Sequence, residues 1–210
     1  MIIGFVGTIG SGKGTAGDIL AQRGFFTESF AAPLKDITAS LFGWPRHLVE
    51  GDTTESREFR ETRDEWWSNR FGKDITPRLI LQLIGTECMR ECIHSDFWVA
   101  CLERRIKQNH DYVITDVRFP NEIDSIHKMG GKIVEIQRGK PADWYVHACM
   151  YNNGQSGVKP DAHYSEWAWM GYKTDYTINN DGSLDDLEKD IELMLECLTP
   201  PRYSDTIIFI

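Results

Sequence analysis

The apolar positions of this chain fall into short runs separated by stretches of helical period. Residues 2–6 and 112–115 are almost wholly apolar, whereas residues 184–198 carry apolar side chains three or four positions apart. Buried strands that alternate with helical segments are typical of open α/β sheets. The pattern predicts an α/β fold whose strands are residues 2–6, 24–30, 112–115, 132–136 and 175–178.

Two longer segments interrupt this alternation within a single domain, residues 1–210. Residues 51–108 are largely charged or helical in pattern, and we interpret them as a helical insertion on the substrate side. Residues 139–172 lose clear periodicity and are rich in glycine and aromatic residues, which is typical of a lid or an irregular loop. The apolar tail, residues 207–210, is a candidate for an edge strand or for contact with a second subunit.

The first strand leads into a glycine-rich turn before a helical segment. Gly7, Gly12 and Lys13 have the spacing G-x-x-x-x-G-K, in which backbone N–H groups face phosphate oxygens and the lysine adds a positive charge. Residue 14 is a glycine, so Thr15 is the nearest hydroxyl for Mg²⁺. A plain β-turn before a core helix is the alternative. We expect ATP to be bound by Gly10, Ser11, Gly12, Lys13, Gly14 and Thr15.

Charged residues follow the ends of other predicted strands. Asp116 and Arg118 come after residues 112–115, and Arg138 comes after residues 132–136. Ligands of open α/β sheets bind at this carboxyl edge, where an aspartate can hold Mg²⁺ or its water and an arginine can neutralise phosphate. Lys35, in the first turn of a helix predicted to reach residue 42, belongs to the same edge, although a solvated surface lysine is an equal alternative.

The predicted helix at residues 76–90 carries a polar stripe. Arg78, Gln82, Thr86 and Arg90 recur at every fourth position, and Gly85 adjoins them. Such a stripe is usually a solvent-facing surface, but a side-chain amide can also read the edge of a nucleobase. A glycine within a helix costs about 1 kcal/mol relative to alanine, so we expect a ligand or another backbone to approach Gly85 closely.

The arginines of residues 51–73 allow two interpretations. Arg57, Arg60 and Arg63 recur at three-residue intervals and could meet a phosphate from one side. Carboxylates lie between them, so an exposed, ion-paired helix is the interpretation we favour.

Composition narrows the functional classes. The net charge of −9 argues against a nucleic-acid or anionic-membrane surface, and no apolar run approaches the length of a membrane span. The five cysteines include no CxxC pair, which suggests neither a disulfide framework nor a zinc site and fits a reducing cytoplasm. Cys88 and Cys92 share a helical face, and we expect them to be buried as small hydrophobic residues.

The ordered set of motifs resembles the deoxynucleoside monophosphate kinases of tailed bacteriophages, a branch of the phosphate-loop (P-loop) kinases. The loop motif is shared by many kinases, but the full set is more specific. It consists of residues 12–15, residues 30–36, the Arg78–Glu87 run, Trp98, residues 116–118, Arg138, His163 with Ser165 and Glu166, and residues 178–183.

This resemblance implies a five-stranded parallel sheet flanked by helices and the transfer of the ATP γ-phosphoryl group to a deoxynucleoside monophosphate with Mg²⁺. It implies catalytic roles for Lys13, Arg118 and Arg138, and a Mg²⁺ site at Thr15 and Asp116, in part through water. Its implied acceptor-binding residues are Lys35, Arg78, Gln82, Gly85, Thr86 and Trp98. It also suggests a homodimer and, for a phage-encoded enzyme, the cytoplasm of the host cell.

The sequence does not determine which nucleobase the acceptor carries, because residues 51–67 and 139–161 match the family poorly. Two other functions also stay open. One is a small-molecule kinase of the phosphomevalonate kinase type, which shares an Asp-x-Arg after a strand but needs no base-reading stripe. The other is a non-catalytic module in which bound nucleotide changes the affinity for a partner.

Overall fold

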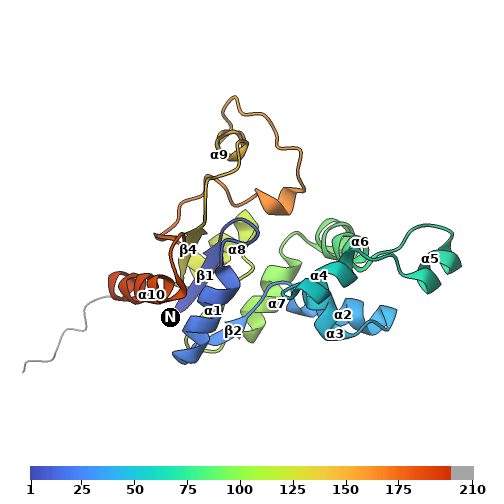
Figure 1. The fold of residues 1–210 in the computed structure, drawn as a ribbon, viewed down its shortest axis with the longest axis horizontal. Helices are drawn as coiled ribbons and strands as arrows, with labels where there is room; N and C mark the ends of the chain where they lie inside the picture. Colours follow the sequence, from blue (N-terminus) through green and yellow to red (C-terminus); the bar gives the residue numbers. More distant parts are fainter. Residues whose placement is uncertain (200–210) are drawn as a thin grey trace, which may run out of the picture.

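A five-stranded parallel sheet forms the centre of the computed structural model, which describes residues 1–199 (Figure 1). The strand order is β2-β3-β1-β4-β5, and every pairing is parallel; in β1, Ile3 lies opposite Val113 of β3 and Lys132 of β4. The predicted α/β fold with five parallel strands is therefore confirmed. The strands are β1 (Ile2–Val6), β2 (Phe26–Glu28), β3 (Tyr112–Ile114), β4 (Lys132–Gln137) and β5 (Tyr176–Asn179).

Helices cover both faces of the sheet, because alternate strand residues point to opposite sides. Phe5 and Ile136 pack with Leu20 and Ile191 of the helices on one face, while Ile114 packs with residues of the helices on the other. The first face is covered by α1 (Lys13–Gln22) and α10 (Leu184–Leu198), and the second by α7 (Phe97–Arg105) and α8 (Pro120–Lys128).

A group of short helices with its own apolar core lies at one end of the sheet (Figure 1). Trp44, Val49, Ile75 and Ile80 are buried in this core. Most of the predicted insertion belongs here, whereas α7 packs against the sheet. The helices are α2 (Ala32–Phe42), α3 (Arg46–Glu50), α4 (Thr54–Glu61), α5 (Glu65–Phe71), α6 (Pro77–Gln82) and a π-helix, η1 (Leu83–Ile93).

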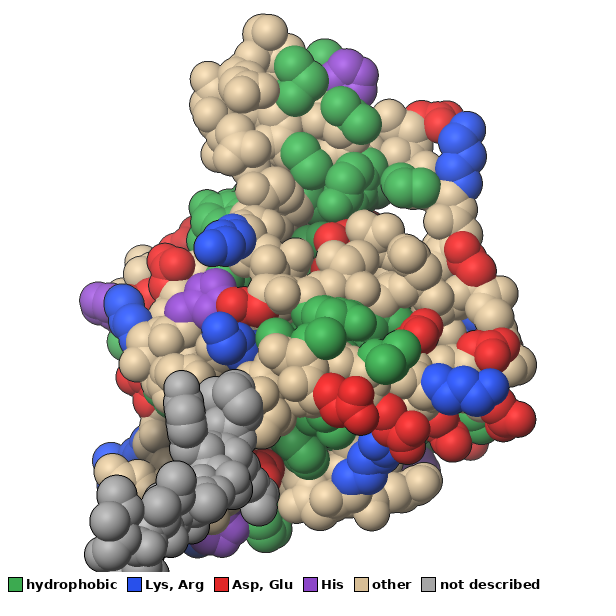
Figure 2. Space-filling view, turned by 90° about the vertical axis from the view of Figure 1, so that its left-hand side faces the viewer, with side chains coloured by type: hydrophobic (Ala, Val, Ile, Leu, Met, Phe, Trp, Pro, Cys, Tyr) green, Lys and Arg blue, Asp and Glu red, His purple; other side chains and the backbone are tan. Residues whose placement is uncertain are grey.

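The 139–172 segment projects from the sheet beyond β4 (Figure 1). It is less irregular than its sequence suggests, because it contains an unpredicted helix, α9 (Tyr145–Asn152), and a short 3₁₀ turn, η2 (Tyr164–Glu166). The Asn152 amide donates hydrogen bonds to the carbonyl oxygens of Trp167 at 3.0 Å and Met170 at 2.8 Å, which closes the segment on itself. Hydrophobic side chains gather on the surface of this projection (Figure 2).

Of two further sequence-based expectations, one is wrong and the other is not tested. Cys88 and Cys92 are exposed rather than buried, because η1 turns that face away from the core. The apolar tail at residues 207–210 lies outside the described residues. None of the helices in the described part of the chain has the length and apolar character needed to cross a membrane.

Candidate active site

The loop between β1 and α1 has the backbone shape of a phosphate-binding loop. Gly7, Gly10 and Gly12 have φ angles of 148°, 81° and 103°, which residues with a Cβ atom rarely adopt. A Cβ at Gly7 would also collide with the carbonyl oxygen of Ile136 in β4. Gly12 directly precedes α1, so the loop leads to a helix N-terminus, whose free N–H groups attract anions.

Asn180, just after β5, supports this loop from the other end of the chain. Its Nδ2 atom donates a hydrogen bond to the backbone oxygen of Ser11 at 2.9 Å, and both residues are buried. The same amide lies so close to Gly12 that a Cβ there would collide with it. The sequence resemblance included residues 178–183 without giving Asn180 a role, because no local pattern reveals a contact across 169 positions.

Lys13 folds back over the loop. Its Nζ atom donates hydrogen bonds to the carbonyl oxygens of Gly7 at 2.8 Å and Thr8 at 2.7 Å. Burial, together with the nearby positive charge of Arg118, lowers the pKa of the Lys13 ammonium group to about 8. Within residues 1–199, Lys13 forms no ion pair with a carboxylate, so its charge is available for an anion.

A first cavity, of about 410 Å³, opens beside this loop; we call it the loop cavity. It extends from Gly7 and Thr8 past the end of β4 to the 139–172 segment. Lys13, Arg118 and Arg138, the three predicted catalytic residues, all line it. None of the other predicted ATP-binding residues lines it: Ser11 is buried, Gly12 is partly buried, and Gly10, Gly14 and Thr15 are exposed.

A second cavity, of about 340 Å³, lies between the sheet and the short helices; we call it the helical cavity. It meets the loop cavity at Ile9, Arg118, Ser165 and Glu166, which line both. The structure therefore places the two cavities side by side. The helical cavity is lined by all six predicted acceptor-binding residues, which are Lys35, Arg78, Gln82, Gly85, Thr86 and Trp98.

The polar stripe reaches one cavity because the helix changes type. Residues 76–90 were predicted as one α-helix, but α6 gives way to the π-helix η1 at Leu83. Four residues exceed one turn of an α-helix and fall short of one turn of the wider π-helix, so the drift of the stripe partly cancels. Arg78, Gln82, Thr86 and Arg90 consequently all line the helical cavity.

Gly85 is where three elements meet. A Cβ at this position would lie 2.8 Å from Cδ2 of Leu34 in α2, so the close neighbour is a side chain of the protein. The indole N–H of buried Trp98 donates a hydrogen bond to the Gly85 carbonyl oxygen at 2.9 Å. Gly85 and Trp98 thus form a fixed wall of the helical cavity.

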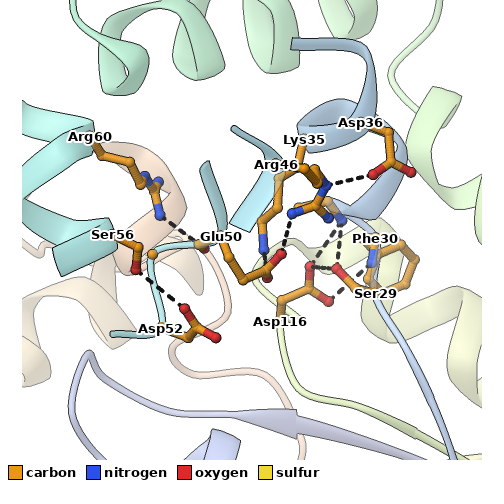
Figure 3. Close-up of polar contacts among 12 residues, drawn as sticks. Ser29, Phe30, Lys35, Asp36, Arg46, Glu50, Asp52, Ser56, Arg60 and Asp116 are labelled. Carbon is orange, nitrogen blue, oxygen red and sulfur yellow. Dashed lines mark hydrogen bonds and ion pairs between the residues drawn. The ribbon is translucent and has the colours of Figure 1, made fainter. Parts of the chain in front are cut away.

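Asp116 holds the loop between β2 and α2. Its carboxylate accepts hydrogen bonds from the hydroxyl of Ser29 at 2.7 Å and from the backbone N–H groups of Phe30 at 3.0 Å and Ala31 at 2.9 Å (Figure 3). Asp116 lines the helical cavity with its oxygens already engaged. This arrangement suits contact with a metal ion through water better than direct ligation.

Lys35 is neutralised by a carboxylate of the protein. Glu50 forms ion pairs with both Lys35 and Arg46, and Arg46 also contacts Asp36 at 2.6 Å (Figure 3). Although burial alone would raise it, hydrogen bonds from Lys35 and Arg46 hold the pKa of Glu50 below its ordinary value. Lys35 lies in the helical cavity as predicted, but its charge is shared with Glu50.

Arg60, near the end of α4, differs from Arg63, which follows this helix. Arg63 is partly exposed and forms ion pairs with Glu65 and Asp74, as the sequence interpretation expects. Arg60 instead lines the helical cavity, and its buried Nε atom has no hydrogen-bond partner in the described part of the chain. Its main-chain contact is a long hydrogen bond of 3.4 Å to the Glu50 carbonyl oxygen (Figure 3). The exposed, ion-paired interpretation was therefore wrong for Arg60. Arg57 is exposed, but it too lines the helical cavity and forms no ion pair in the described part of the chain; its hydrogen bonds go to the carbonyl oxygens of Gly51 and Asp52.

Positive charge accumulates around Arg60. Burial, together with the charges of Arg78 and Arg118, lowers the pKa of its guanidinium group, which stays protonated. Arg78 is paired with Glu61, whereas Arg60 and Arg118 form no ion pair within residues 1–199. A cluster of this kind favours an anion such as a phosphate. The sequence signal that could have identified Arg60 is Gly51, whose missing Cβ makes room for the guanidinium group.

The η2 turn brings part of the 139–172 segment to both cavities. Ser165 and Glu166 line each of them, and His163 lines the helical cavity. Nδ1 of His163 lies 2.8 Å from the hydroxyl oxygen of Ser165, which fixes the turn. The sequence resemblance included these residues without giving them a role.

The chain matches the family described as deoxynucleotide monophosphate kinase over residues 47–191. A protein of Acanthamoeba polyphaga mimivirus with the provisional name deoxynucleotide monophosphate kinase is 36% identical over 154 residues, which cover 66% of this chain and 74% of that protein. The deoxynucleoside-5'-monophosphate kinase of Escherichia phage T5 is 54% identical over 50 residues, which cover 23% of this chain and 20% of that protein.

Among solved structures, the shikimate kinase of Aquifex aeolicus aligns with a TM-score of 0.46 and 14% identity, over 93% of this chain and 96% of that one.

Proposed function

The chain belongs to the deoxynucleotide monophosphate kinase family, and from this premise we propose that the loop cavity binds ATP and the helical cavity binds a deoxynucleoside 5'-monophosphate. The position of Arg118 carries this proposal. It lines both cavities, and its charge acts on Lys13 in one and on Arg60 in the other. A phosphoryl group that passes between the cavities would pass this guanidinium group.

The reaction needs alignment and charge neutralisation more than covalent catalysis. An oxygen of the acceptor 5'-phosphate forms a bond to the γ-phosphorus of ATP, and the bond from that phosphorus to the β,γ-bridging oxygen breaks. ADP and a deoxynucleoside diphosphate result. Lys13 and the loop N–H groups would hold the β- and γ-phosphates, while Arg118 and Arg138 would neutralise the group in transfer.

Mg²⁺ fits the donors that the site offers. The ion prefers oxygen ligands and keeps several waters, so phosphates and a few protein oxygens suffice. Thr15 places a hydroxyl in the exposed first turn of α1, and Asp116 would act through water because its carboxylate is already engaged. Bound Mg²⁺ supplies charge neutralisation at the phosphates.

On the acceptor side, we assign the 5'-phosphate to Arg60 and Arg78, with Lys35 as an ion-paired neighbour. Arg60 is the strongest candidate because no carboxylate of the described chain pairs with it. Gln82 and Thr86 lie along the same wall and would contact the base. Gly85 and Trp98 would shape the surface against which the nucleoside packs.

The direct test is ADP release from Mg·ATP with dTMP, dGMP, dCMP, dAMP or mevalonate 5-phosphate offered separately. We expect turnover with one or more deoxynucleotides, and the pattern will define the base preference. Turnover with mevalonate 5-phosphate alone would instead support the phosphomevalonate kinase alternative. Absence of turnover with every acceptor would contradict the proposal and favour a nucleotide-dependent binding module.

A further inference from the structure

Glu122 is a buried carboxylate that the proposed reaction does not use. It lies in the first turn of α8, and only 2% of the residue is exposed. One oxygen accepts a hydrogen bond from the Arg90 guanidinium group at 2.6 Å. The other accepts hydrogen bonds from the backbone N–H groups of Arg118 at 2.8 Å and Phe119 at 3.0 Å. This one side chain therefore holds the main chain at Arg118.

Arg90 joins Glu122 on the wall of the helical cavity, which both residues line. Arg90 comes from η1 and places its guanidinium carbon 4.1 Å from the centroid of the Phe119 ring. It also donates a hydrogen bond to the Ser95 carbonyl oxygen at 3.1 Å, so both of its terminal nitrogens are engaged. The planar guanidinium group is thus fixed in direction by three neighbours.

A buried carboxylate at this position is energetically demanding. Burial raises the pKa of Glu122 to about 7, even though Arg90 and the two backbone donors oppose the increase. Buried ion pairs often contribute no more stability than well-packed apolar residues of the same volume. Stability alone is therefore a weak reason for a glutamate and an arginine to meet beside the two cavities.

We propose that Glu122 is a positioning residue that sets the direction of Arg118 and couples it to Arg90 on the wall of the helical cavity. The proposal rests on the phosphoryl-transfer function assigned above. Binding of an acceptor against Arg90 is linked through one carboxylate to the main chain that carries Arg118. Glu122 consequently fixes the position of Arg118 relative to Arg90 on the wall of the helical cavity.

Replacement by glutamine tests the carboxylate with little change of volume. A glutamine has one accepting oxygen and one donating NH₂ group, whereas Glu122 faces donors on both sides. In either orientation the NH₂ group would face Arg90 or the two backbone N–H groups. Glu122→Gln must therefore break one of the two links.

The experiment measures steady-state kinetics of Glu122→Gln, Arg118→Ala and the double variant with the best natural acceptor. We expect Glu122→Gln to lower kcat by roughly 100-fold, the scale of a small misplacement of a catalytic group, while the KM for ATP changes little. In the Arg118→Ala background, Glu122→Gln should lower kcat no further. Independent, multiplicative losses of kcat would overturn the proposal, because Glu122 would then not act through Arg118.

Glu103→Gln is the matched control. Glu103, on α7, accepts a hydrogen bond from Ser125 of α8 at 2.6 Å and lines neither cavity. It should leave kcat unchanged, and an equal loss of kcat in this control would show that any loosening of α8 is sufficient. Thermal unfolding reports whether each variant is folded.

Arg90→Lys provides a second route if Glu122→Gln does not fold. A lysine keeps the positive charge but lacks the planar guanidinium group that contacts Glu122 and Ser95 at once. Arg90→Lys should therefore lower kcat in the wild-type background but not in the Arg118→Ala background. Equal losses in both backgrounds would contradict the coupling. The proposed function fails separately, if the wild-type enzyme phosphorylates no deoxynucleotide, because that result does not depend on any Glu122 variant.

Discussion

The short helices of residues 51–93 and the 139–172 segment both border the helical cavity. The first region brings positively charged side chains to it, and the second brings polar side chains without arginine. Residues 51–93 contain six arginines, of which Arg57, Arg60, Arg78 and Arg90 line the cavity. The 139–172 segment contains no arginine and seven tyrosines and tryptophans. Its contribution to the cavity is the polar η2 turn, backed by buried Trp167 and Trp169.

This difference indicates how charge neutralisation and the exclusion of water are distributed between the two regions. In the proposed assignment, the charge for an acceptor phosphate comes from helices with their own packed core, while Arg118 and Arg138 follow the ends of strands. The 139–172 segment offers aromatic cover and hydrogen bonds but little positive charge. We infer that charge neutralisation is built into the framework and that the segment mainly restricts the access of water.

The largest expected effect comes from the residue that both cavities share. Arg118→Ala should lower kcat by about 10³-fold, the lower end of the range for an arginine that stabilises phosphoryl transfer. Arg23→Ala is the control, because Arg23 forms a surface ion pair with Glu192 and lines neither cavity. A loss of less than about tenfold in kcat would show that the 139–172 segment or another region supplies the missing charge.

The next effect separates two arginines of one helical region. Arg60→Ala should raise the KM of the deoxynucleotide by roughly 10- to 100-fold, since a hydrogen bond to a charged group contributes about 1.5–3 kcal/mol. Arg63→Ala should leave this KM unchanged, because Arg63 is paired with Glu65 and Asp74 and lines neither cavity. Equal effects of the two substitutions would break the distinction between cavity-lining and surface arginines.

Solution pH distinguishes the loop lysine from the arginines. With a pKa of about 8, Lys13 loses its proton as the pH rises through that value, whereas arginine stays charged. kcat/KM for ATP should therefore fall by about tenfold per pH unit above pH 8, because this ratio reports the free enzyme. This decline above pH 8 should be absent in Lys13→Arg, whatever the absolute rate of that variant. An unchanged decline in the variant would show that another group titrates.

The smallest effect concerns the attachment of the 139–172 segment. The Tyr145 hydroxyl donates a hydrogen bond of 3.2 Å to the buried carboxylate of Glu135 in β4, and both residues line the loop cavity. Tyr145→Phe should lower kcat/KM for ATP by roughly tenfold, which corresponds to about 1.5 kcal/mol, the lower end of the range for a hydrogen bond to a charged group. Tyr151→Phe, on the exposed side of α9, serves as the control. A loss confined to the KM of the deoxynucleotide would contradict this assignment.

The parts of the site that lie close together in sequence could be predicted. The spacing of Gly7, Gly12 and Lys13 and the four-residue step from Arg78 to Arg90 are local patterns, and each encodes a geometry directly. The strand ends placed Arg118 and Arg138 at one edge of the sheet for the same reason.

Other parts depend on contacts that no local pattern contains. Asn180 meets Ser11 only because β5 lies two strands from β1, and Arg60 is enclosed only because Gly51 folds against it. Local composition suggested that every arginine of residues 57–63 had a carboxylate partner. The prediction that Cys88 and Cys92 are buried was wrong for a related reason. Periodicity identifies a helical face but not what covers it.

The most direct test of the account compares the affinity of the enzyme for its best deoxynucleoside monophosphate with that for the same deoxynucleoside without phosphate. Equilibrium binding is measured for the wild type, Arg60→Ala and Arg63→Ala. We predict that the wild type and Arg63→Ala bind the monophosphate far more tightly than the nucleoside, and that Arg60→Ala loses most of this difference. If Arg60→Ala keeps the full difference, the acceptor phosphate does not bind at the arginine cluster, and the division of work described above is wrong.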